Sequence, residues 1–138
     1  MSQPVLQLRM FDRDQDHAMM VEWCDAHGAT ASPAAFLPRL GVIVQMDGVD
    51  SAALFLFMDN SCPVASIDCA ATRPKLSTKD AIACFEFAIG FLKSEARHNG
   101  YAIIMAHAPK AQARILSRLG FNTNEEGLVR MFIPTAEN

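Results

Sequence analysis

The stretch ARILSRLGF (residues 113–121) decides the fold, because it predicts a helix that ends at a glycine and passes into a strand without a loop. Gly120 can adopt the left-handed conformation that commonly ends a helix. Phe121 can then fold back on Ile115 or Leu116 and fix the direction in which the chain leaves the helix. The junction therefore predicts a short helix that leads directly into the last strands of a sheet.

The segments around this junction alternate between strand-like and helix-like patterns. Alternating or continuous apolar residues predict strands, and capping residues followed by apolar residues at three- and four-residue spacing predict helices. The predicted strands cover residues 4–11, 41–48, 51–59, 64–72 and 101–108, with two short pieces in 121–134, and the predicted helices cover residues 14–27, 32–40, 78–98 and a last stretch from Pro109. This order predicts an α/β fold, with a mixed central sheet and helices on both faces.

Two strands of this sheet are expected to run parallel. Residues 64–72 and 101–108 are joined by the longest helix, whose broad apolar face suits a sheet, and such a crossover is right-handed. Within the first of these strands, alternation places Ser66 and Asp68 on one face and Cys69 on the other. The polar pair is therefore expected to face away from Cys69.

The composition is that of an ordinary globular protein. The chain has 138 residues, of which 51% are hydrophobic and 20% charged, so one domain over residues 1–138 is expected. A net charge of −3 without Lys/Arg-rich runs argues against nucleic-acid binding, and no apolar run approaches the roughly 20 residues of a membrane span. Residues 1–12 lack a secretory signal pattern, so we expect a cytoplasmic protein with reduced cysteines. Paired CxxC spacing is absent, so no metal is expected.

The order of elements, together with Leu119-Gly120-Phe121, resembles the GNAT superfamily of N-acetyltransferases. In that family a short helix ends in a Leu-Gly-Phe junction and leads straight into the final strand hairpin. The resemblance covers nearly the whole chain in the order of its elements, and it implies an acyl-CoA N-acyltransferase-like fold. The alternative is an unrelated α/β domain in which the same junction arises by coincidence.

The resemblance also implies a site for acetyl-CoA. In GNAT enzymes acetyl-CoA lies where two parallel strands part, and backbone N–H groups at the start of the longest helix grip its pyrophosphate. Here residues 64–72 and 101–108 would have to part at their far ends, beside residues 72–80. The residues implied to contact acetyl-CoA are Cys69, Ala70, Ala71 and Thr72 of the strand, and Lys75, Ser77, Thr78 and Lys79 of the loop and helix start.

The chain departs from the family pattern at two points. The family loop resembles Arg/Gln-x-x-Gly-x-Gly/Ala, whereas TRPKLSTKDAIA (residues 72–83) contains no glycine. Residues 77–79 then either bind phosphate through side chains and amides, or form a helix cap with a solvated lysine. The Tyr that many family members place four residues before the junction glycine is replaced by Leu116.

Two residues are the candidates for proton transfer. The resemblance implies that Asp68 takes a proton from the acceptor amine, as the family's base on the fourth strand often does. A carboxylate in an otherwise apolar strand is costly to bury unless it lines a cleft or meets a cation, and both alternatives are open. His107, at the C-terminal end of its predicted strand, either replaces the missing Tyr as the acid or is a histidine that is simply hydrogen-bonded.

These features imply an acyltransferase that moves an acetyl group from acetyl-CoA to an amine of a small-molecule or peptide acceptor. The missing glycines and the missing Tyr favour an alternative, a GNAT-like fold that has lost the reaction and serves as a binding or structural protein. Small GNAT-like proteins of this kind occur among bacteriophages, including some internal virion components, and this chain resembles them in its compactness and its degenerate loop. A homodimer is compatible with the sequence, which does not identify the acceptor.

Overall fold

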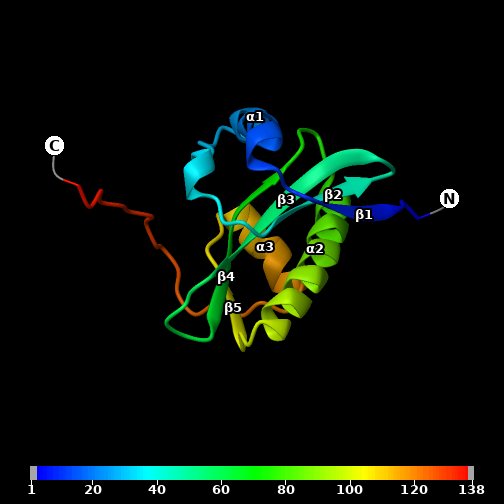
Figure 1. Cartoon of the computed structure of the whole chain (residues 1–138). Helices are drawn as coiled ribbons and strands as arrows, with labels where there is room; N and C mark the ends of the chain where they lie inside the picture. The colour runs from blue at the N-terminus through cyan, green and yellow to red at the C-terminus, as the bar shows by residue number, and fades with distance from the viewer. Residues whose placement is uncertain (1–2, 137–138) are drawn as a thin grey trace.

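A five-stranded sheet in the order β1-β2-β3-β4-β5 forms the centre of the computed structural model, which describes residues 3–136 (Figure 1). The strands are β1 (Leu6–Met10), β2 (Gly41–Met46), β3 (Val49–Met58), β4 (Val64–Thr72) and β5 (Ile103–Ala106). The helices are α1 (Arg13–Ala26), the 3-10 turn η1 (Ala34–Phe36), α2 (Thr78–His98) and α3 (Lys110–Arg118). Strands β1 to β4 pair antiparallel, and β5 runs parallel to β4.

The sheet carries a hydrophobic core on each face. On one face β2, β3 and β4 pack against α2 and α3, through residues that include Val42, Leu54, Leu56, Ile67, Phe85, Leu92 and Leu116. On the other face β2 and β3 pack against α1, through residues that include Phe11, Met20, Trp23, Ile43 and Phe55. The predicted mixed sheet with helices on both faces is therefore confirmed. Each helix in residues 3–136 is too short or too polar to span a lipid bilayer.

The junction that opened the sequence analysis has the predicted form. Gly120 has φ +99°, in the region that favours glycine, and the Phe121 N–H donates to the Leu116 carbonyl over 3.1 Å. Phe121 is half-buried against the core that includes Ile115 and Leu116. The helix end thus turns the chain back onto the α2 face of the sheet.

The strands predicted within residues 121–134 are not formed. The sheet of the described residues ends at β5, and the segment after Phe121 is irregular up to residue 134. Large apolar side chains that would cover a sheet are instead 64–86% exposed: Leu128, Val129, Met131, Phe132 and Ile133. A strand-like sequence forms a strand only where a neighbouring strand satisfies its backbone, and here Arg130 holds the segment near Asp68 of β4 instead.

Two further elements differ from the prediction. The helix predicted over residues 32–40 is reduced to η1, because Pro38 disfavours the helical conformation at the residue before it. The strand predicted as buried over 101–108 is the short edge strand β5, where Ile103 and Met105 are 57% and 42% exposed. These side chains are exposed because the sheet ends at this strand.

A bulge interrupts the alternation of β4. Phe55 of β3 lies opposite Asp68 and Ala53 lies opposite Ala71, so Cys69 and Ala70 together occupy the space opposite one residue. Cys69 has φ +60° and packs with the core on the α1 face, the face that Asp68 also occupies. The predicted separation of Asp68 and Cys69 onto opposite faces is therefore wrong, because a bulge adds one residue to the strand and shifts the pattern that follows.

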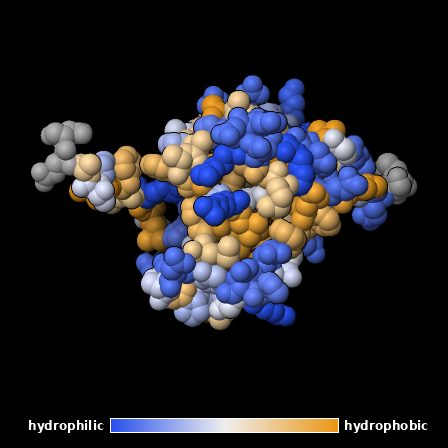
Figure 2. All heavy atoms as spheres, viewed as in Figure 1, coloured by the Kyte–Doolittle hydropathy of each residue, from blue (hydrophilic) through white to orange (hydrophobic). Residues whose placement is uncertain are grey.

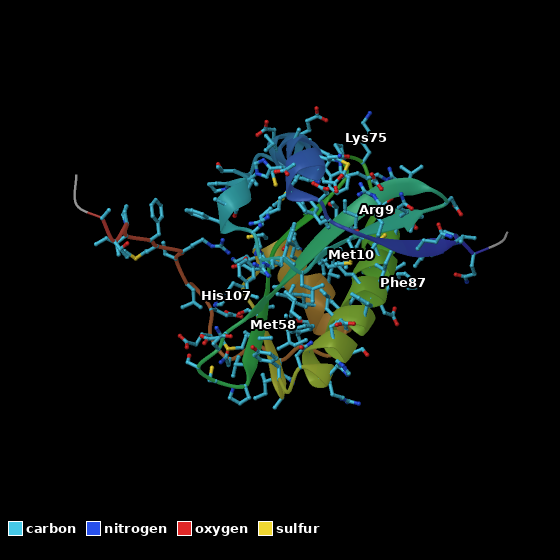
Figure 3. All side chains as sticks on the ribbon, viewed as in Figure 1. Arg9, Met10, Met58, Lys75, Phe87 and His107 are labelled. Atoms are coloured by element: carbon cyan, nitrogen blue, oxygen red, sulfur yellow. The ribbon has the colours of Figure 1, made fainter. Side chains whose placement is uncertain are left out.

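Arg9 joins β1, α1 and β3 through two carboxylates (Figure 3). Its guanidinium donates two hydrogen bonds of 2.9 Å to Asp16 and two of 3.1 and 2.8 Å to Asp50. These hydrogen bonds lower the pKa of both carboxyl groups. Asp16 is only 8% exposed, so its charge depends on this partner and on the Asp12 N–H, which donates to it over 2.8 Å.

Replacing Arg9 by Gln is expected to lower the free energy of unfolding at neutral pH by about 1–2 kcal/mol, between the values for exposed and buried pairs. Because the two carboxyl pKa values are lower in the folded chain than in the unfolded chain, this stabilisation exists above the ordinary carboxyl pKa and is lost as the pH falls through the folded values. The difference between wild type and Arg9→Gln, measured by urea denaturation, should therefore shrink at about pH 3. Arg114→Gln, on the exposed side of α3, is the control; a difference independent of pH would contradict this account.

Gly41 is expected to tolerate no side chain. A Cβ there would lie 2.5 Å from Cδ1 of Phe55, whose fully buried ring packs edge-to-face on Phe11 with centroids 4.8 Å apart. Gly41→Ala should therefore lower the free energy of unfolding by about 1–3 kcal/mol. At Gly90, within α2, a Cβ meets open space, so Gly90→Ala should raise it by about 0.5–1 kcal/mol. Urea denaturation of both variants checks the pair, and effects of the same sign would refute it.

Candidate functional site

The parallel strands β4 and β5 pair over only four residues and then part. Their register runs from Val64 opposite Ile103 to Ile67 opposite Ala106. Beyond this point β4 continues to Thr72, whereas the chain leaves β5 and begins α3. No other strand lies between β4 and β5 in the sheet. The predicted parting of these strands at their far ends is therefore confirmed, whereas residues 72–80 are not among those that line the cleft that opens there.

A cleft of about 730 Å³ opens where the strands part. Asp68 enters it from β4 and His107 enters it from the residue that follows β5, so the two predicted proton-transfer residues line one cavity. Figure 3 shows His107 on the side of the molecule where the C-terminal segment departs. Cys69 and Ala70 also line the cleft. The cleft thus brings together residues that are almost 40 positions apart in the chain.

Asp68 is both in a cleft and paired with a cation. Its Oδ1 accepts a hydrogen bond of 2.7 Å from the Cys69 N–H and a second hydrogen bond from the guanidinium of Arg130. The side chain of Asp68 is 20% exposed and that of Arg130 is 60% exposed. This hydrogen bond to Asp68 raises the pKa of Arg130. The sequence left open whether Asp68 lines a cleft or meets a cation, and in the structure it does both.

The backbone of β4 beyond the bulge is already engaged by the protein's own side chains. Gln112 of α3 donates from Nε2 to the Ala70 carbonyl over 3.1 Å. His27 Nε2 lies 3.1 Å from the Thr72 carbonyl and 3.2 Å from its hydroxyl. Ala71 is 4% exposed and packs in the α1-side core. An extended ligand that bonds to this strand must therefore displace Gln112 or His27.

The loop between β4 and α2 presents an exposed N-terminal helix end. Ser77 Oγ accepts from the Asp80 N–H over 3.1 Å, so the predicted helix cap is confirmed. The N–H groups of Thr78 and Lys79 precede the first intrahelical hydrogen bonds and point out of the helix end. Helix N-termini of this kind attract anions.

Lys75 stands in this loop with φ +65°, a conformation that favours glycine. Figure 3 shows its side chain pointing away from the body of the protein. Lys75 and Lys79 are both exposed, and Arg73 ties the loop to β3 through Ser51, with its Nε 3.1 Å from Oγ and its N–H 2.9 Å from the carbonyl. The loop therefore reaches a left-handed turn without a glycine and places two lysines beside the helix end.

Sequence reasoning missed three residues that contact the cleft or its strand. Gln112 carries a usable signal, since it is a polar residue in the first turn of a helix that begins where β5 ends. For His27 the only signal in the sequence is its position near the end of α1. Arg130 sits in a segment that was expected to form a strand, so nothing in its pattern pointed to Asp68.

Cysteine chemistry adds no metal site. All four cysteines are free thiols, and residues 3–136 hold no group of three or more His, Cys, Asp or Glu placed to bind a metal ion. Burial raises the pKa of Cys84 to about 11 and also raises the pKa of Cys24. Ser32 Oγ lies 3.2 Å from Cys69 Sγ at the wall of the cleft.

No protein-family model matches the chain. No curated protein matches it in sequence.

Solved acetyltransferase structures match the whole fold. An aminoglycoside N-acetyltransferase in complex with CoA has a TM-score of 0.65 at 12% identity, covering 95% of this chain and 97% of the other. A predicted acetyltransferase with acetyl-CoA from Clostridium acetobutylicum has a TM-score of 0.61 at 17% identity, covering 92% and 96%. An aminoglycoside acetyltransferase from an uncultured soil metagenomic sample, in complex with sisomicin, has a TM-score of 0.61 at 11% identity, covering 95% and 97%. At these identities the likeness establishes the fold.

Proposed function

We propose, from the GNAT acetyltransferase fold that this chain has, that it transfers an acetyl group from acetyl-CoA to an amine. The observation that carries the proposal is the parting of β4 and β5 after four paired residues; α2 begins six residues after the end of β4. This parting exposes strand backbone to a cleft that also holds a carboxylate and an imidazole. Thioester aminolysis needs a place for the thioester and a base for the amine, and a positioned acid assists the departure of the thiolate.

The residues fit acetyl-CoA at its two ends in different ways. The phosphate end would lie against the Thr78 and Lys79 N–H groups, with Lys75 adding charge. The pantetheine end would lie along β4 from Cys69 to Thr72, after Gln112 moves away from the Ala70 carbonyl. Acetyl-CoA supplies the activated acyl group, and the chain supplies its orientation.

Asp68 and His107 are assigned the proton transfers. An amine that is protonated at neutral pH must lose a proton before it can attack, and Asp68 receives it directly or through water. His107, which lines the same cleft, donates a proton to the departing CoA thiolate. The role of His107 takes the place of the family's tyrosine, since Leu116 at that position is 7% exposed and belongs to the core.

The second candidate is a GNAT-fold binding or structural protein without CoA turnover. Its support is that Gln112 and His27 occupy the carbonyls of Ala70 and Thr72, which a pantetheine arm would need. The absence of glycine in the loop points the same way. Binding of acetyl-CoA separates the two candidates.

Acetyl-CoA at 100 times its dissociation constant is expected to stabilise the protein by about 2.7 kcal/mol, seen as a rise in melting temperature. Lys79→Gln should weaken the binding, because it removes a positive charge beside the helix end. Lys93→Gln is the control, as Lys93 is an exposed lysine farther along α2. No shift at millimolar acetyl-CoA would favour the second candidate.

Asp68→Asn is expected to lower kcat/KM for an amine acceptor by about 10²–10⁴, the contribution of a positioned base. The rise in melting temperature with acetyl-CoA should stay unchanged, since Asp68 lies away from the phosphate end. CoA release during turnover measures the rate, and Asp25→Asn on the exposed part of α1 is the control. Unchanged turnover in Asp68→Asn would remove Asp68 from the mechanism.

A further inference from the structure

We propose that Arg130 occupies the place of the acceptor's own cationic group, so that the site takes amines that carry their positive charge to Asp68 on an uncharged, largely apolar body. The inference deepens the proposed function and rests on it for the identity of Asp68 as an acceptor contact. Its structural basis is the ion pair between Arg130 and Asp68 inside the cleft. A guanidinium and an alkylammonium both donate charge-assisted hydrogen bonds to a carboxylate.

The walls of the cleft select for this class of acceptor. Asp68 and Arg130 are the only Asp, Glu, Lys or Arg side chains among the residues that line it, together with the imidazole of His107 and the thiols of Cys24 and Cys69. The remaining wall is made of apolar and polar uncharged side chains from α1 and the segment that follows it, from β4, from the start of α3 and from the C-terminal segment. When Arg130 leaves, the carboxylate of Asp68 is the one acidic side chain of the cleft wall, a place that favours a cation and disfavours an anion.

Arg130 is held loosely enough to be displaced. The segment that carries it makes its side-chain hydrogen bonds to the body through Arg130 alone among the described residues. Its neighbours Val129 and Met131 are 79% and 85% exposed, and the segment runs away from the body of the protein beyond this contact (Figure 1). Figure 2 shows hydrophobic atoms along this projecting segment. A pair this exposed is worth at most about fivefold in an equilibrium constant.

The competing assignment makes Arg130 an anchor for an acidic acceptor. Its two terminal nitrogens face Asp68 and Cys69 within the protein, so an anion would have to compete with the carboxylate of Asp68. The cationic assignment is therefore favoured, and the charge of the preferred ligand distinguishes the two.

The test uses the full chain and three probes of one shape: hexylammonium, hexanol and hexanoate. Calorimetric titration at low salt should show that hexylammonium binds more tightly than hexanol, by up to about fivefold. Arg130→Gln should tighten hexylammonium about three- to fivefold, because it removes the internal competitor. Asp68→Asn should abolish the preference for hexylammonium over hexanol. Arg118→Gln, at the exposed end of α3, should leave all three affinities unchanged.

Three results would overturn the inference: equal binding of hexylammonium and hexanol, no gain in Arg130→Gln, or hexanoate binding that Arg130→Gln abolishes. The comparison of hexylammonium with hexanol needs no variant, so it decides the matter even where Asp68→Asn fails to fold. The fate of the proposed function is read separately, from the thermal shift with acetyl-CoA. If the cation binds as expected but acetyl-CoA does not bind, the inference about Arg130 stands and the assignment as an acyltransferase is wrong.

Discussion

The parallel pairing of β4 with β5 stops at Ile67 and Ala106, and the candidate site depends on this stop. Two features of the chain cause it. The bulge at Cys69 shifts the backbone of β4 by one residue, and Pro109 has no N–H with which to continue a ladder. If the ladder continued, the carbonyls of Ala70 and Thr72 would be used by a neighbouring strand and the cleft would close.

Side chains of the protein itself contact the polar groups of β4 that the parting of β4 and β5 exposes. Gln112 donates a hydrogen bond to the Ala70 carbonyl, and Arg130 donates one to the Asp68 carboxylate. His27 Nε2 lies within hydrogen-bond distance of the Thr72 carbonyl. Each of these contacts resembles one that a ligand would make, since the groups involved are an amide, an imidazole ring and a cation. At the N-terminal end of α2, Ser77 Oγ accepts from the Asp80 N–H, whereas the Thr78 and Lys79 N–H groups precede the first intrahelical hydrogen bonds. The helix end is therefore ready for an anion, whereas the strand and the carboxylate require an exchange of partners.

Local signals predicted most of the fold. The helix over 78–98 has the predicted bounds, because its cap, its apolar face and its closing Asn99-Gly100 agree. The Asp47-Gly48 turn has φ values of 51° and 81°, the conformation that a two-residue hairpin needs. The bulge and the fate of residues 121–134 were not predictable, since both depend on distant partners. The family resemblance and the predicted strands made Asp68 and His107 the candidates for proton transfer, but Arg130 lies 62 residues from Asp68 and no pattern links them.

The outer edge of β5 has a consequence for the behaviour of the protein in concentrated solution. From Ile103 to Ala106 this strand has no charged side chain, proline or bulge, the devices by which natural sheets discourage foreign strands. Its free backbone N–H and C=O groups and its exposed Ile103 and Met105 offer a template to any extended apolar peptide. The length of four residues limits this template, and a lysine in place of Ile103 or Met105 would block it further.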